Sequence, residues 1–170
     1  MNAALERINH AGEADAESMF RDCCGSAEWA RRMTTSRPFV SDRELIETAG
    51  AIWYGLETAD WLEAFSAHPK IGETRAASSQ DTRSAKWSEG EQAGMNSADA
   101  PLRQELAVAN REYYEKFGFI FIVCATGKSA EEMLEHCRVR ISNERETEIA
   151  IARSEQQKIT EIRLKKLLSL

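Results

Sequence analysis

The chain of 170 residues carries a formal net charge of −6, and 42% of its residues are hydrophobic. That length supports one domain with one core. The acidic balance, without a clustered basic face, argues against nucleic-acid binding. No apolar run approaches the roughly 18 residues that cross a bilayer, and residues 1–9 do not resemble a secretory signal. We therefore expect a soluble, cytoplasmic protein.

The first third of the chain is predicted to be helical. Residues 2–33 have irregular helical spacing of apolar residues, interrupted near Gly12 and Gly25, which favours two helices joined by a turn. The segment Ser41–Glu44 then fits a capping box. Apolar residues at helical spacing follow it and predict a helix that runs to about Gly55.

The first candidate catalytic residue along the chain is His68. Pro69 follows it directly and ends the preceding helical pattern, so that the histidine is expected in a loop. Histidine titrates near neutrality, which makes it the side chain best suited to proton transfer at physiological pH. Residues 73–90 are polar and predict a surface loop, and the polar cluster at residues 87–92 either starts a helix or lines a pocket.

The most apolar run of the chain is residues 117–125. Such a run normally indicates a buried strand, but the sequence contains no second strand candidate to pair with it. Its backbone N–H and C=O groups must therefore find partners in helices, water or a ligand. The backbone of this run is a candidate binding wall.

The remaining segments are predicted to be helices. Residues 91–117 have helical periodicity, and Ser129–Glu132 fits a second capping box. Residues 144–168 predict a long charged helix, whose buried stripe is expected at Ile149, Ala152, Ile159 and Ile162. The fold class expected is all-α, a single compact domain of about seven or eight helices with one short extended segment near the site.

Less specific interpretations of the candidate residues stay open at this point. His68 fits a solvated loop histidine, and Ser88 and Glu91 fit the first turn of a helix, where both residue types are favoured. Arg163 fits a solvated arginine on a charged helix. The four cysteines and three histidines have no spacing typical of a metal site, so no metal is expected, and a site built on His68 with Glu63 or Glu73 has only weak support.

Several motifs, in this order along the chain, resemble one known family, 2-oxo-4-hydroxy-4-carboxy-5-ureidoimidazoline (OHCU) decarboxylase. The motifs are Arg37-Pro38-Phe39, His68-Pro69, Ser88-x-x-Glu91-Gln92-Ala93-Gly94, Phe117-Gly118-Phe119-x-Phe121-Ile122, the segment from Arg140 to Glu148, and Glu161-Ile162-Arg163-Leu164. The resemblance covers most of residues 1–170. It implies a cofactor-free helical homodimer that decarboxylates OHCU to (S)-allantoin in urate degradation.

The resemblance also implies roles for individual residues. His68, Glu91 and Arg163 match catalytic positions, with His68 as the proton-transfer group. The substrate contacts that it implies are Pro69, Ser88, Glu89, Gly90, Glu91, Gln92, Phe121, Ile122, Val123, Cys124, Ala125 and Arg163. Apolar groups on the early helices, such as Trp29 and Trp53, are expected to be exposed and covered by a partner subunit.

Two rival functions remain. One is a helical binding or adaptor domain, in which His68 is incidental and the charged C-terminal helix is a partner surface. The other is a lyase that acts on a related cyclic ureide.

Overall fold

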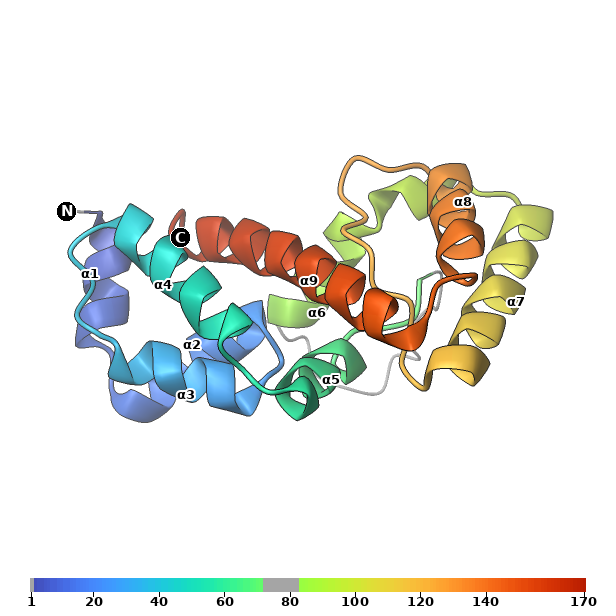
Figure 1. Cartoon of the computed structure of the whole chain (residues 1–170). Coiled ribbons are helices and arrows are strands. Elements are labelled where there is room, and N and C mark those ends of the chain that lie inside the picture. The colour runs from blue at the N-terminus through green and yellow to red at the C-terminus, as the bar shows by residue number, and fades with distance from the viewer. Residues whose placement is uncertain (1, 72–82) are drawn as a thin grey trace. The chain divides into compact units, whose positions relative to one another are not determined.

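The computed structural model of the chain describes residues 2–71 and 83–170, and all regular elements within these ranges are helices (Figure 1). The elements are α1 (Ala3–His10), α2 (Glu13–Cys23), α3 (Ala27–Thr35), α4 (Asp42–Tyr54), α5 (Thr58–Ser66), α6 (Arg83–Glu91), the 3₁₀ helix η1 (Ala93–Ser97), α7 (Ala100–Phe117), α8 (Ala130–Arg140) and α9 (Arg145–Leu167). The all-α prediction is confirmed. The described ranges contain one or two helices more than expected, partly because residues 2–33 form three helices instead of two.

The residues group into two compact units, Met1–Ala64 with Gln157–Leu170, and Phe65–Gln156. Each unit is described by itself below. The assignment of residues 1–170 to one domain stays a prediction. No helix in the described part of the chain is long and apolar enough to cross a membrane.

The first unit is built on aromatic residues of its early helices. α3 packs against both α2 and α4, and the Trp29 ring lies edge-on to Phe20 at a centroid distance of 6.0 Å. The Trp29 indole N–H donates to the Ala49 carbonyl at 3.1 Å. Trp29 is 0% exposed and Trp53 is 1% exposed. The expectation that these two tryptophans are exposed is wrong, because both pack inside their own unit.

The two predicted capping boxes differ in the structure. At α8 the box is complete, since the Ser129 hydroxyl accepts from the Glu132 N–H at 3.1 Å and the Glu132 carboxylate accepts from the Ser129 N–H at 2.7 Å. At α4 the Ser41 hydroxyl accepts from the Glu44 N–H. The Glu44 carboxylate, however, accepts from the N–H of Val40 at 2.6 Å, one residue before the expected donor. Both helices still begin where the pattern predicts.

The second unit has an aromatic core around Tyr113. The ring of Tyr113 lies 4.5 Å from Phe117, 5.9 Å from Phe119 and 5.4 Å from Phe121, measured between centroids. Gly118 ends α7 in the left-handed conformation, with φ of 77°, which glycine adopts without strain. Residues 120–125 then form neither helix nor strand. A non-helical segment therefore lies within the run 117–125 where an extended segment was expected, although Phe117 still belongs to α7.

The prediction of a surface loop at residues 73–90 is wrong for its second half, which forms α6. Residues 73–82 lie outside the described residues. The helix was missed because the residues that α6 buries, Ser88 and Glu91, are polar and three positions apart. They therefore give no apolar periodicity, although Arg, Lys and Glu favour helices.

Gly94 in η1 is expected to tolerate no side chain. A Cβ atom at this position would overlap the backbone carbonyl oxygen of Lys128. We therefore expect Gly94→Ala to lower the free energy of unfolding by about 1–3 kcal/mol, and the melting temperature by roughly 2–12 °C. Thermal unfolding by circular dichroism measures the change. Gly90→Ala is the matched control, because nothing lies within 4 Å of that position. Equal melting temperatures for the two variants would contradict this expectation.

Candidate functional site

His68 lies just after α5, in the loop position that the sequence predicts. Its backbone N–H donates to the Phe65 carbonyl at 3.2 Å, which turns the chain at the end of the helix. Its imidazole is half-buried, and its Nε2 atom lies 2.6 Å from the Oε1 atom of Gln156. Gln156 lies on α9 and is 0% exposed. The histidine ring is therefore held by a buried partner and is not an unrestrained surface group.

Glu91 is the last residue of α6 and is 8% exposed. Ser88 lies one turn earlier on the same helix and is equally buried, so the two side chains share one face of α6. Glu89 and Gly90 are exposed, and Gln92 is half-buried. Of the five predicted contacts in this segment, Ser88 and Glu91 are thus the two that face the protein interior.

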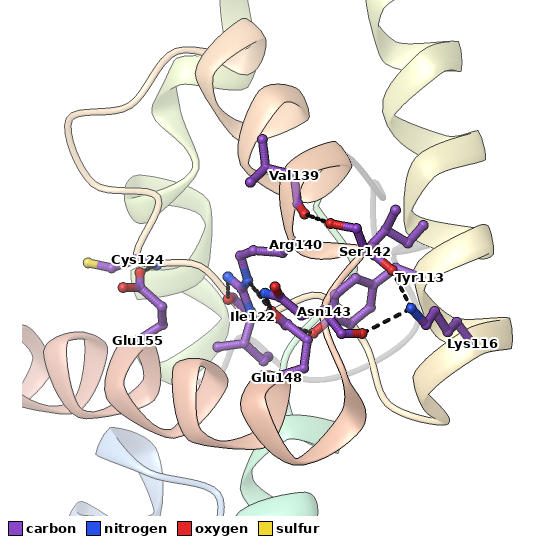
Figure 2. Close-up of polar contacts among 11 residues, drawn as sticks. Tyr113, Lys116, Ile122, Cys124, Val139, Arg140, Ser142, Asn143, Glu148 and Glu155 are labelled. Atoms are coloured by element: carbon purple, nitrogen blue, oxygen red, sulfur yellow. Dashed lines mark hydrogen bonds and ion pairs between the residues drawn. The ribbon is translucent and has the colours of Figure 1, made fainter.

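The predicted binding wall, residues 121–125, is buried throughout. Its backbone is held by side chains instead of by a neighbouring strand. The Ile122 carbonyl accepts from Arg140 Nη1 at 2.6 Å, and the Cys124 N–H donates to Glu155 Oε2 at 2.7 Å (Figure 2). The Cys124 carbonyl accepts from Lys128 Nζ at 2.7 Å. The expectation that these backbone groups need partners outside a sheet is confirmed.

Two consecutive residues of α9 serve both parts of this site. Glu155 holds the Cys124 N–H, and Gln156 holds the His68 ring. Burial raises the pKa of the Cys124 thiol, and the negative charges of Glu155 and Glu91 raise it further. Glu155 and Gln156 therefore link the wall to the His68 ring within the unit Phe65–Gln156.

The buried ion pair of Arg140 and Glu148 contacts the backbone of the wall at Ile122. Arg140 Nε donates to Glu148 Oε1 at 2.8 Å, and Arg140 Nη2 donates to Glu148 Oε2 at 3.0 Å. The Tyr113 hydroxyl donates to the same carboxylate at 2.5 Å. The Arg140 guanidinium carbon also lies 4.6 Å from the centre of the Phe121 ring, within the range of a cation–π interaction. Figure 2 shows Arg140 between Glu148 and the Ile122 carbonyl.

The electrostatics of this cluster follow from burial. Burial raises the pKa of the Tyr113 hydroxyl, and the hydrogen bond to Glu148 raises it further. Burial alone would lower the pKa of Arg140, but the hydrogen bonds and charges of Glu148 and Tyr113 together outweigh burial and raise it. Tyr113 therefore stays neutral and Arg140 stays charged, so that the Ile122 carbonyl accepts from a permanent cation.

Arg163 lies on α9 in the other unit and is 4% exposed, which does not fit a solvated helix arginine. Its Nη1 atom donates to the Asp22 carbonyl at 3.4 Å. Burial raises the pKa of the nearby Cys24 thiol to about 11, although hydrogen bonds to Ser26 and Thr160 and the charge of Arg163 act in the opposite direction. Convergence of Arg163 with His68 and Glu91 stays a prediction, because those two residues belong to the second unit.

No metal cluster is found in the described part of the chain, where no three His, Cys, Asp or Glu side chains are arranged to hold an ion. A pocket of about 280 Å³ lies along α7 and α8. It contains none of the predicted site residues, and its one cation, Arg138, is paired with Glu105 at 2.6 Å. A site at His68, Glu91 and residues 121–125 stays a prediction.

The chain is similar to known proteins in both sequence and structure. A sequence model of the family described as OHCU decarboxylase matches residues 9–165. A crystal structure of OHCU decarboxylase in the presence of (S)-allantoin is 42% identical, with a TM-score of 0.78, and the match covers 90% of this chain and 99% of that one. A second solved structure, of (S)-allantoin synthase, is 18% identical with a TM-score of 0.68, covers 96% of this chain and 53% of that one, and supports the fold alone.

The chain is also similar to curated proteins whose names refer to uric acid degradation or to OHCU decarboxylase. The uric acid degradation bifunctional protein TTL of Arabidopsis thaliana is 44% identical over 154 residues, which cover 90% of this chain and 47% of the relative. The 2-oxo-4-hydroxy-4-carboxy-5-ureidoimidazoline decarboxylase of Amia calva is 29% identical over 142 residues, which cover 82% of this chain and 79% of the relative. The chain spans about half, or less, of the length of the bifunctional relatives that it matches.

Proposed function

Because the chain belongs to the OHCU decarboxylase family, we propose that it converts OHCU to (S)-allantoin and CO2. The observation that carries this proposal is the 42% identity, over nearly the full length of the other chain, to an OHCU decarboxylase crystallised with (S)-allantoin. The described site supports it with a held histidine, a buried carboxylate and a wall of fixed backbone groups.

The chemistry requires proton transfer and charge stabilisation. The bond from C4 of the substrate to its carboxylate breaks, CO2 leaves, and the electron pair forms a C4=C5 double bond while the ring C=N nitrogen takes up a proton. The resulting enol loses its hydroxyl proton as C4=O forms, and C5 gains a proton on one face. One proton is consumed overall. The substrate itself accepts the electron pair, so the protein has to supply orientation and proton transfer.

The residues fit these tasks. His68 removes the hydroxyl proton or gives one to carbon, Glu91 holds the imidazole or a substrate N–H, and Arg163 neutralises carboxylate or developing negative charge. Pro69, Ser88 to Gln92 and residues 121–125 are proposed to shape the pocket. The buried pair of Ser88 and Glu91 contributes polar groups to its inner face, and the exposed Glu89 and Gly90 lie on the outer side of α6.

Activity is proposed to need no cofactor. We expect dialysis against a chelator to leave the rate of OHCU disappearance unchanged, because the substrate C=N already accepts the electron pair. The rate before and after dialysis, with and without added divalent cation, is the measurement. A loss of activity that a divalent cation restores would show that a metal takes part in the reaction.

A homodimer and a cytoplasmic location are also proposed. The family resemblance is the support for the dimer, since the tryptophans expected at its interface are buried within one unit. Light scattering at micromolar protein is expected to give a mass of about twice 19.1 kDa. A concentration-independent mass of 19.1 kDa would contradict the dimer.

The function is tested by adding purified protein to OHCU generated in situ. We expect OHCU to disappear well above its spontaneous rate, and boiled protein to have no effect. Titration calorimetry with (S)-allantoin provides a second readout. An adaptor domain would leave the spontaneous rate unchanged and bind no allantoin, and a lyase for a related cyclic ureide would consume that ureide but not OHCU.

A further inference from the structure

The contact between His68 and Gln156 determines which ring nitrogen carries the proton in the neutral imidazole. His68 Nε2 lies 2.6 Å from Gln156 Oε1. An amide oxygen accepts hydrogen bonds and cannot donate them, so a bond at this distance requires a proton on Nε2. In the neutral imidazole the in-plane lone pair is then on Nδ1.

Gln156 is well placed to impose this tautomer. Its side chain is 0% exposed, so that its amide cannot exchange His68 for bulk water without uncovering a buried polar group. The preceding residue, Glu155, is fixed in turn by the Cys124 N–H at 2.7 Å. Both contacts, and both parts of the site that they hold, lie in the unit Phe65–Gln156.

We propose that Gln156 is a positioning residue that fixes His68 in the Nε2–H tautomer, and that Nδ1 is the ring nitrogen that exchanges a proton with the substrate. The second half rests on the proposed OHCU decarboxylase activity. When Nδ1 takes the hydroxyl proton, the ring becomes a cation whose Nε2–H still donates to Gln156. When Nδ1 gives a proton to C5, the ring returns to its starting tautomer.

The tautomer is tested by nitrogen-15 NMR on protein with labelled histidine. The chain has three histidines, so the His68 signals are assigned as those that His68→Asn removes. In the parent protein we expect the Nε2 signal in the range of a protonated ring nitrogen and the Nδ1 signal in the range of an unprotonated one. The reverse assignment in the parent protein would overturn the proposal, whatever the variants do.

Gln156→Met keeps the length of the side chain but removes the acceptor. We expect the two His68 nitrogen signals to move toward a mixture of tautomers. In the same variant kcat should fall by roughly 10-fold to 10²-fold, the range found for groups that orient the histidine ligands of metal sites, with KM changed much less. Gln156→Glu keeps an acceptor oxygen and should restore the Nε2–H assignment. An unchanged tautomer in Gln156→Met would overturn the proposal.

Gln157→Met is the matched control, because it makes the same change one residue further along α9, where the glutamine side chain lies beside Gly50. It should alter neither the His68 signals nor kcat. The spectra need no turnover, so they report the tautomer of His68 independently of any activity on OHCU. A parent protein with the expected tautomer but no activity on OHCU would overturn the function and the role of Nδ1, and leave the positioning by Gln156 supported.

Discussion

His68→Asn is expected to lower kcat by about 10²–10⁴-fold, the usual contribution of general acid–base catalysis. His68 lies in a loop after α5 and is half-buried, so its removal takes little from the core. The buried Gln156 loses its hydrogen bond with His68, and the loss of a buried hydrogen bond costs about 1–3 kcal/mol of stability. The variant should therefore remain folded and still bind (S)-allantoin. Initial rates with OHCU made in situ, together with calorimetry, give both quantities.

His136→Asn is the matched control for this variant. It makes the same replacement on α8 at a histidine that is exposed, and it should change neither the rate nor allantoin binding. If His68→Asn converts OHCU at the parent rate, proton transfer belongs to another group. The adaptor interpretation would then gain only if the parent rate itself equals the spontaneous one.

Glu148→Ala is expected to lower the free energy of unfolding by about 3–5 kcal/mol, because it leaves the Arg140 charge buried without its partner. The side chains of Arg140 and Glu148 are 8% and 0% exposed. Tyr113 loses its acceptor in the same variant. For a chain of this length the loss corresponds to a decrease of roughly 6–20 °C in melting temperature, which calorimetry and urea unfolding measure.

An exposed pair provides the comparison. Arg138 and Glu105 are 2.6 Å apart, slightly closer than the buried pair at 2.8 Å. Both of their side chains are more than half exposed, so Glu105→Ala should cost no more than about 1 kcal/mol. The double variant Arg140→Met/Glu148→Leu should be less destabilised than the sum of its single variants, because it removes both charges. Strict additivity of the two changes would mean that the ion pair does not stabilise the unit.

Local sequence signals predicted most of the helices. The start of α8 follows from Ser129 and Glu132, whose reciprocal bonds need only four consecutive residues. The start of α4 follows from Ser41, although Glu44 bonds one residue earlier than expected. The burial of Trp29 could not be predicted in this way. It depends on which helices meet, and that is decided by residues far apart in the sequence.

The buried face of α9 contains polar residues that the apolar pattern of the sequence did not predict. Ile149, Ala152 and Ile159 are buried as predicted, but Ile162 is only half-buried, and the neighbouring Arg163 is buried in its place. Gln156 lies at the spacing of this stripe, four residues after Ala152 and three before Ile159, and is completely buried. Polar residues on an otherwise apolar stripe are the signal that would have indicated Gln156 before the structure was known.

No local sequence pattern of this kind indicates the ion pair of Arg140 and Glu148. Arg140 is in the last turn of α8, where a positive charge interacts favourably with the helix dipole. Glu148 is in the first turn of α9, where a negative charge does so. Their sequence positions are therefore explained without any contact between them. Only the fold brings them to Tyr113 and to the Ile122 carbonyl.

The most direct measurement of the central claim is the chirality of the product. OHCU that decays spontaneously gives both enantiomers of allantoin, whereas a proton delivered to one face of C5 gives one. Circular dichroism of the product mixture is recorded after complete conversion, with and without the protein. We predict a signal of (S)-allantoin alone when the protein is present. Racemic allantoin formed at the spontaneous rate would contradict the assignment of this chain as an enzyme that decarboxylates OHCU and protonates the product.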